Sequence, residues 1–127
     1  MVRLLVWVFV LINIGLGVAC LVDPMGVLAP VGVTTLSEAG VIELRAMYGG
    51  MEFGFGVFLA WCALHPERAR IGLTAATLQI GGLGFARLGA CLVGWPDGWL
   101  FPFLCVVEIG SALLGTVVLC WPRKEAE

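Results

Sequence analysis

The sequence predicts an all-α fold: a four-helix bundle in which every helix spans a membrane, with both termini in the cytoplasm. Hydrophobic residues make up 61% of the chain and charged residues only 13%, a composition outside the usual range of soluble domains. Four apolar stretches each reach the roughly 20 residues that a transmembrane helix requires. Breaks with proline, glycine or charged residues separate them. Since these stretches fill nearly the whole length, we expect one transmembrane domain over residues 1–127.

The first predicted helix, residues 4–22, is apolar except for Asn13 near its middle. We expect this amide to bond a neighbouring helix or the backbone, which is worth on the order of 0.6 kcal/mol in a membrane. Asp23 and Pro24 end the helix, because proline disfavours helical geometry in the residue before it. Residues 26–34 are apolar but too few to cross, so we place them at the membrane interface.

The second predicted helix, residues 36–64, follows a capping-box spacing from Thr35 to Glu38. Its length of about 43 Å exceeds the hydrocarbon thickness, so its first two turns should project from the membrane, which the helix enters at Arg45. After a break at His65, residues 68–93 form the third helix, antiparallel to the second.

The fourth predicted helix, residues 99–121, follows a turn that contains Pro96 and Gly98. Orientation follows from the excess of lysine and arginine on the cytoplasmic side. With four spans, one side carries Arg3, Arg68, Arg70, Arg123 and Lys124. The opposite side has Arg45 beside several acids, so both termini are predicted to be cytoplasmic.

Three ionisable residues lie well inside the predicted spans, all roughly 10 to 14 Å from the same interface. Unpaired charges there would cost about 2.5 to 3.5 kcal/mol each, so we predict that these side chains pair. The predicted site, a buried charge network or a site for a ligand or proton, comprises Glu52, Arg87, Glu108, Arg45, Tyr48 and Glu43, with Asp97 nearby. Such a network either fixes helix register alone or binds a proton or ligand.

Small residues share helix faces with these charges, and small faces let membrane helices approach closely. We expect close packing at Gly49, Gly50, Gly54, Gly56, Gly84 and Gly115. Gly50 and Gly54 have G-x-x-x-G spacing on a second face, which would serve the first helix or another protein.

Catalytic and metal signatures were not found. His65 is the only histidine, and the five cysteines form no C-x-x-C pair. Thr74, Thr77 and Gln79 are expected to bond the backbone of their own helix. A net charge of −2 without a basic cluster argues against nucleic acid as a partner. We therefore predict a protein that is not an enzyme and has no cofactor or metal.

The stretch Glu43 to Gly50, with Gly84 to Arg87, Asp97-Gly98 and Glu108, resembles an uncharacterised bacterial family of small four-helix integral membrane proteins. That family is catalogued as a domain of unknown function and is loosely similar in layout to DoxX-like proteins. The resemblance implies a multi-pass protein of the bacterial cell inner membrane and no particular activity.

Two functions follow as expectations. The first is a structural or accessory component of a membrane assembly, whose partners would be membrane lipid and a larger complex or further copies of the chain. The alternative is a small transporter or proton-coupled channel that uses Glu52, Arg87 and Glu108, and it requires a hydrated path to these residues. A membrane redox enzyme ranks third.

Overall fold

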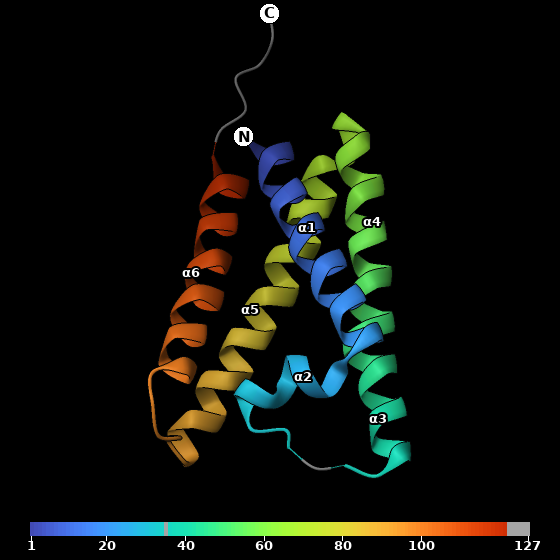
Figure 1. Ribbon diagram of the computed structural model, residues 1–127. Coiled ribbons are helices and arrows are strands. Elements are labelled where there is room, and N and C mark those ends of the chain that lie inside the picture. The colour runs from blue at the N-terminus through green and yellow to red at the C-terminus, as the bar shows by residue number, and fades with distance from the viewer. Residues whose placement is uncertain (35, 122–127) are drawn as a thin grey trace, which may run out of the picture.

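The computed structural model describes residues 1–34 and 36–121, and every regular element in these two ranges is helical (Figure 1). The prediction of an all-α chain with four long apolar helices is confirmed. By length and composition, the helices able to cross a membrane are Val2–Val22, Glu38–Leu64, Pro66–Val93 and Leu100–Cys120. The predicted bounds differ from these by at most two residues (4 against 2, 36 against 38, 68 against 66).

The second long helix consists of three consecutive segments: α3 (Glu38–Leu44), the π-helix η2 (Arg45–Met51) and α4 (Glu52–Leu64). It begins two residues after the predicted start. Ser37 is the N-cap, and its hydroxyl accepts a hydrogen bond from the Gly40 amide at 3.2 Å. A serine oxygen in this position satisfies an amide that the first turn leaves unpaired, so the helix begins at Glu38. Thr35, the predicted cap, lies outside the described residues.

Two short helices, α2 (Pro24–Leu28) and η1 (Ala29–Val31), follow α1 (Val2–Val22). The Asp23 carboxylate accepts a hydrogen bond from the Gly26 amide at 2.9 Å, which caps α2. In Figure 1, α2 lies across the lower end of the bundle between the long helices.

The remaining elements are η3 (Pro66–Arg68), α5 (Ala69–Val93) and α6 (Leu100–Cys120). The long helices pack mainly as two antiparallel pairs, α1 with α4 and α5 with α6, and α5 joins the pairs by contacting both α1 and α4. We call the end where α4 meets α5 the His65 end, and the opposite one the Gly94 end. The two pairs diverge toward the Gly94 end, where α5 hardly touches η2 (Figure 1).

The hydrophobic core gathers at the His65 end. It consists of Val6, Phe9, Val10, Leu59, Ala63, Leu73, Ala76 and Val118, from all four long helices. Leu59 and Leu73 are completely buried. The Arg87–Glu108 pair and the Asn13–Gln79–Glu52 group described below lie outside this core.

Glycines set the distance between paired helices. A Cβ atom on Gly17 would lie 2.5 Å from the Phe53 amide nitrogen, and one on Gly56 would lie 2.6 Å from Ile14 Cγ1. Contacts this short leave no room for any side chain, so α1 and α4 touch through their backbones.

The predicted set of packing glycines divides in two. Gly49 faces Leu21, Gly84 faces Glu108, and Gly115 faces Thr77. The expectation that the face with Gly50 and Gly54 serves the first helix is wrong within the described residues, and the alternative, another protein, stays a prediction. A Cβ on Gly54 would meet nothing within 4 Å, and one on Gly50 would meet only a carbonyl of its own helix. Helix α1 therefore uses the other face of η2 and α4.

Candidate functional site

An ion pair between Arg87 of α5 and Glu108 of α6 lies inside the bundle. Arg87 Nε donates to both carboxylate oxygens of Glu108, at 3.1 and 2.9 Å, and Nη2 donates to Oε1 at 2.8 Å. The Glu108 side chain is 6% exposed and that of Arg87 is 21% exposed. A planar guanidinium that bonds both oxygens of one carboxylate gives the strongest form of such pairing. The two opposite charges of the pair therefore cancel, and both carboxylate oxygens of Glu108 accept hydrogen bonds from Arg87.

Helix packing explains why this pair forms. Gly84 precedes Arg87 by one turn, and a Cβ on it would lie 2.9 Å from Glu108 Cβ. The missing side chain lets α6 approach α5 closely enough for the arginine to reach across. The Phe101 ring centroid lies 5.9 Å from Arg87 Cζ, within the range of a weak cation–π contact.

A second polar group joins α1, α5 and α4. Gln79 Nε2 donates to Asn13 Oδ1 and to Glu52 Oε2, both at 3.2 Å. Asn13 is 4% exposed, and its own Nδ2 donates to the Phe9 carbonyl at 2.8 Å. We call Asn13, Gln79 and Glu52 the amide chain. Its hydrogen bonds diverge from Gln79: one branch runs through Asn13 to the Phe9 carbonyl, and the other ends on the Glu52 carboxyl.

The prediction that Glu52, Arg87 and Glu108 form one network is therefore wrong for Glu52. Glu52 belongs to no ion pair in the part of the chain that the structure describes. Three donor contacts from Arg87 already engage both oxygens of Glu108. A bidentate pair uses the fork of the arginine on one carboxylate, and Glu52 bonds Gln79 instead.

Sequence reasoning missed Gln79, which was expected to bond its own backbone. Of the other polar residues on α5, Thr74 does so, donating to the Arg70 carbonyl at 2.8 Å. Thr77 does not, because its hydroxyl is buried without a partner. The one signal that could have found the amide chain was that Asn13 and Gln79 are both amides near the middle of apolar helices, where each needs a partner.

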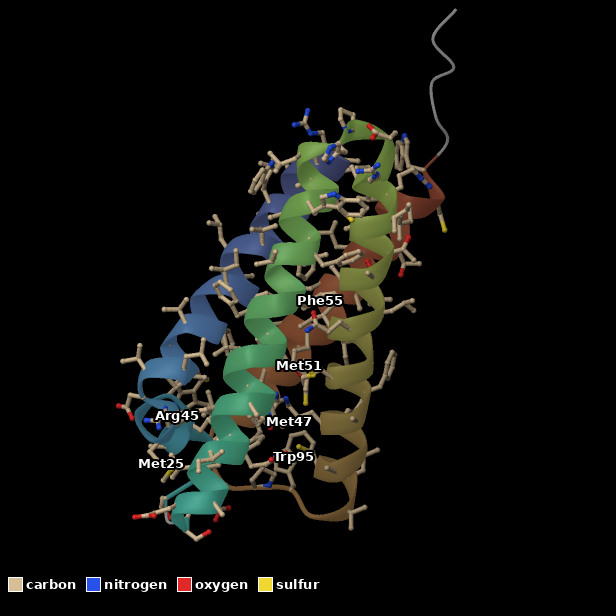
Figure 2. The ribbon with its side chains drawn as sticks, turned by 90° about the vertical axis from the view of Figure 1, so that its right-hand side faces the viewer. Met25, Arg45, Met47, Met51, Phe55 and Trp95 are labelled. Carbon is tan, nitrogen blue, oxygen red and sulfur yellow. The ribbon has the colours of Figure 1, made fainter. Side chains whose placement is uncertain are left out.

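Arg45, Tyr48 and Glu43 were expected to cap the network, and none of them forms a hydrogen bond or ion pair with Arg87, Glu108 or Glu52 in the described residues. All three are exposed, and no side-chain hydrogen bond or ion pair of theirs occurs among residues 1–34 and 36–121. In Figure 2, Arg45 projects to one side of η2, toward α2 and Met25, while Met47 lies on the other side. The exposed ring of Tyr48 is likewise unbonded.

The most distinctive stretch of sequence forms the π-helix η2, immediately before Glu52. A π-helix is rare, occurs mostly as a single turn inside an α-helix, and is frequent at functional sites. Gly49 in this segment packs against Leu21 of α1, so the π-helical turn contacts α1 at this glycine. Met47 and Met51 lie on the face away from α1 and are about half exposed (Figure 2). The segment thus positions the first residue of α4, which is Glu52.

Two hollows in the described part of the bundle lie away from these residues. One cavity of about 100 Å³ lies between α1 and α6 and is lined by apolar side chains and Ser111. A wider hollow at the His65 end is lined by Arg3, Glu67 and Arg70, among others. Neither is lined by Glu52 or by the Arg87 pair.

Comparison with known proteins gives one match. A family model described as "Domain of unknown function (DUF4345)" matches residues 1–119. No curated protein and no solved structure matches the chain.

Proposed function

The chain belongs to the family described as Domain of unknown function (DUF4345), and from its geometry we propose that it is a structural or accessory component of a membrane assembly. It would cross the bacterial inner membrane four times. The observation that carries this proposal is the distribution of polarity: ionic and amide groups pair inside, and apolar side chains cover the outside.

Large apolar side chains are exposed along all the long helices. Leu11 is 72% exposed, Leu78 71%, and Val106 71%. Monomeric soluble proteins rarely expose contiguous apolar surfaces beyond a few hundred Å², whereas hydrocarbon solvates such a surface. This arrangement supports a membrane as the surroundings of the bundle.

The basic residues support the proposed orientation. Arg3 Nε donates to the Ala63 carbonyl at 3.1 Å, and Arg70 donates to the Leu119 carbonyl. Both carbonyls lie in the last turn of a helix, where positive charge is favourable. The His65 end is therefore the basic end, as expected for the cytoplasmic side. Arg123 and Lys124, also counted in the prediction, lie outside the described residues.

An accessory role is favoured over transport because the buried ionic and amide side chains bond one another. Arg87 and Glu108 neutralise each other, Gln79 bridges Asn13 and Glu52, and the cavities described above avoid them. The face with Gly50 and Gly54 is open. Its G-x-x-x-G spacing suits close packing of another transmembrane helix, and we assign this face to the partner.

Filling the open face at Gly50 and Gly54 with larger side chains should release the partner without unfolding the chain. In the double variant Gly50→Leu, Gly54→Leu, the new side chains enter open space, so stability should change by less than about 1 kcal/mol. We expect proteins that co-purify from native membranes in mild detergent to be lost at least tenfold. The matched control is Gly82→Leu, Gly89→Leu, which fills equally open positions on α5.

If the Gly50, Gly54 variant retained the same co-purifying proteins, the face with Gly50 and Gly54 would not be the site that binds the partner. Equal loss in both double variants would point to a general disturbance of the surface. A protein that purifies alone under all conditions would contradict the accessory role itself.

One observation favours the alternative, proton-coupled transport. Glu52 is half-buried and has Gln79 as its single hydrogen-bond partner in the described residues. Proton flux into liposomes that carry the purified protein tests this alternative, with Glu52→Gln as the inactive variant. Flux that is unchanged by this substitution would eliminate a Glu52 pathway.

A further inference from the structure

The amide chain fixes which atoms of Glu52 are engaged. Asn13 Nδ2 donates to the Phe9 carbonyl, so Asn13 must turn its carbonyl oxygen toward Gln79. An amide nitrogen has two hydrogens, and Gln79 gives one to Asn13 and the other to Glu52 Oε2. The second carboxyl oxygen, Oε1, has no hydrogen-bond partner among the residues that the structure describes.

Within residues 1–34 and 36–121, no cation forms an ion pair with Glu52. The arginine at similar depth, Arg87, is committed to Glu108 through three contacts. Helix α1 presents the Cys20 thiol near Glu52, and that thiol would be neutral or negative, never positive. On the same long helix, Arg45 is exposed and makes no ion pair in the described ranges, and neither does the exposed Tyr48 phenol.

One neutral hydrogen bond does not offset the transfer of a carboxylate from water into an apolar bundle, and a group in this position takes up a proton instead. Glu108 is more deeply buried, but the guanidinium of Arg87 lies against both of its oxygens. The two acids thus differ in their partners: Glu108 faces a guanidinium, whereas Glu52 accepts one hydrogen bond from a neutral amide.

We propose, on the basis of the membrane location proposed above, that Glu52 is a proton-binding site held as the neutral acid. Its Oε1 carries the proton and its Oε2 accepts from Gln79. A neutral carboxyl at this depth is also a site of covalent modification by hydrophobic carbodiimides. The O–H adds across one C=N bond to give an O-acylisourea, and the acyl group then migrates to nitrogen as a stable N-acylurea. The adduct retains every atom of both reactants.

The test is labelling of the protein in native membranes with dicyclohexylcarbodiimide over a pH series, read by peptide mass spectrometry. We expect the adduct on Glu52 to exceed that on Glu108 at least tenfold at neutral pH. Because labelling follows the protonated fraction, it should fall about tenfold per pH unit once the pH exceeds the pKa of Glu52. Glu52→Gln should abolish the adduct. The Glu52 to Glu108 ratio in the unsubstituted protein needs no variant and is independent of folding effects.

A second variant separates a protonation site from a merely reactive position. Gln79→Leu removes the donor that favours the ionised form of Glu52, so labelling should persist to higher pH. An unchanged pH profile would show that the amide chain does not control the proton.

Failure of the inference is distinguishable from failure of the membrane location. Extraction of the same membranes with alkaline carbonate tests the location alone, since a spanning protein stays in the pellet. A protein that remains in the membrane but carries no adduct on Glu52, or equal adducts on Glu52 and Glu108, overturns the proton-binding site. Release by carbonate overturns the proposed location.

Discussion

Glu108→Leu is expected to destabilise the protein by about 3–5 kcal/mol, because it leaves the Arg87 guanidinium buried without a counter-charge. The three hydrogen bonds from Arg87 to Glu108 are lost together, and an apolar group replaces the carboxylate. The measurement is reversible unfolding of the purified protein in lipid–detergent bicelles, followed by circular dichroism.

The double variant Arg87→Met, Glu108→Leu is the matched comparison. It removes both charges and keeps most of the side-chain volume, and replacing a whole buried pair in this way is often nearly neutral. We expect the double variant to be more stable than Glu108→Leu by at least about 2 kcal/mol. If the effects of the two substitutions simply add within about 0.5 kcal/mol, the two groups are not paired.

Gly17→Ala is expected to cost about 1–3 kcal/mol or more, the second large effect. Its Cβ would lie 2.5 Å from the Phe53 amide nitrogen, a backbone atom that cannot move aside alone. The helices α1 and α4 would have to separate, which also weakens the contact between Gly56 and Ile14. The same unfolding assay measures the loss.

Gly54→Ala provides the control on the partner helix. It meets nothing within 4 Å, and alanine favours helix over glycine by up to about 1 kcal/mol, so stability should be unchanged or slightly higher. Equal losses in Gly17→Ala and Gly54→Ala would mean that α1 does not rest on α4 through Gly17.

Helix positions were predictable because they depend on local properties. Apolar runs of sufficient length identify the helices, and breaks such as that at Pro66 separate them. The errors are also local. Ser37 caps the second long helix, whereas Thr35 was predicted to do so, because two hydroxyl residues two positions apart offer alternative caps. The π-helical turn of η2 has no sequence signature that distinguishes it from α-helix.

The candidate site was predictable only in part because side-chain partners depend on which helices are neighbours. Arg87 and Glu108 share a layer and lie on consecutive antiparallel helices, so depth and helix face were enough to join them. Glu52 lies at a similar depth, but its closest polar neighbour is Gln79. The depth of a residue in the membrane does not indicate that α1 and α5 pack against each other beside α4. That packing is what brings Asn13 to Gln79.

The same reason explains the glycines. Gly49 and Gly50 are adjacent, yet one packs against α1 and the other is open. Consecutive residues of a helix are rotated by about 100° about its axis, so these two glycines lie on different faces. Only the position of α1 decides which face is covered. Identification of close-packing glycines therefore required the arrangement of the helices.

Topology mapping tests the central claim, four membrane spans with the Arg87 pair and the amide chain buried between them. A reporter that is active only in the periplasm is fused at the C-terminus or inserted after Gly94, in the loop between α5 and α6. The account predicts activity for the Gly94 insertion and none for the C-terminal fusion. Activity on the same side for both fusions, or release of the protein as a soluble species, would contradict it.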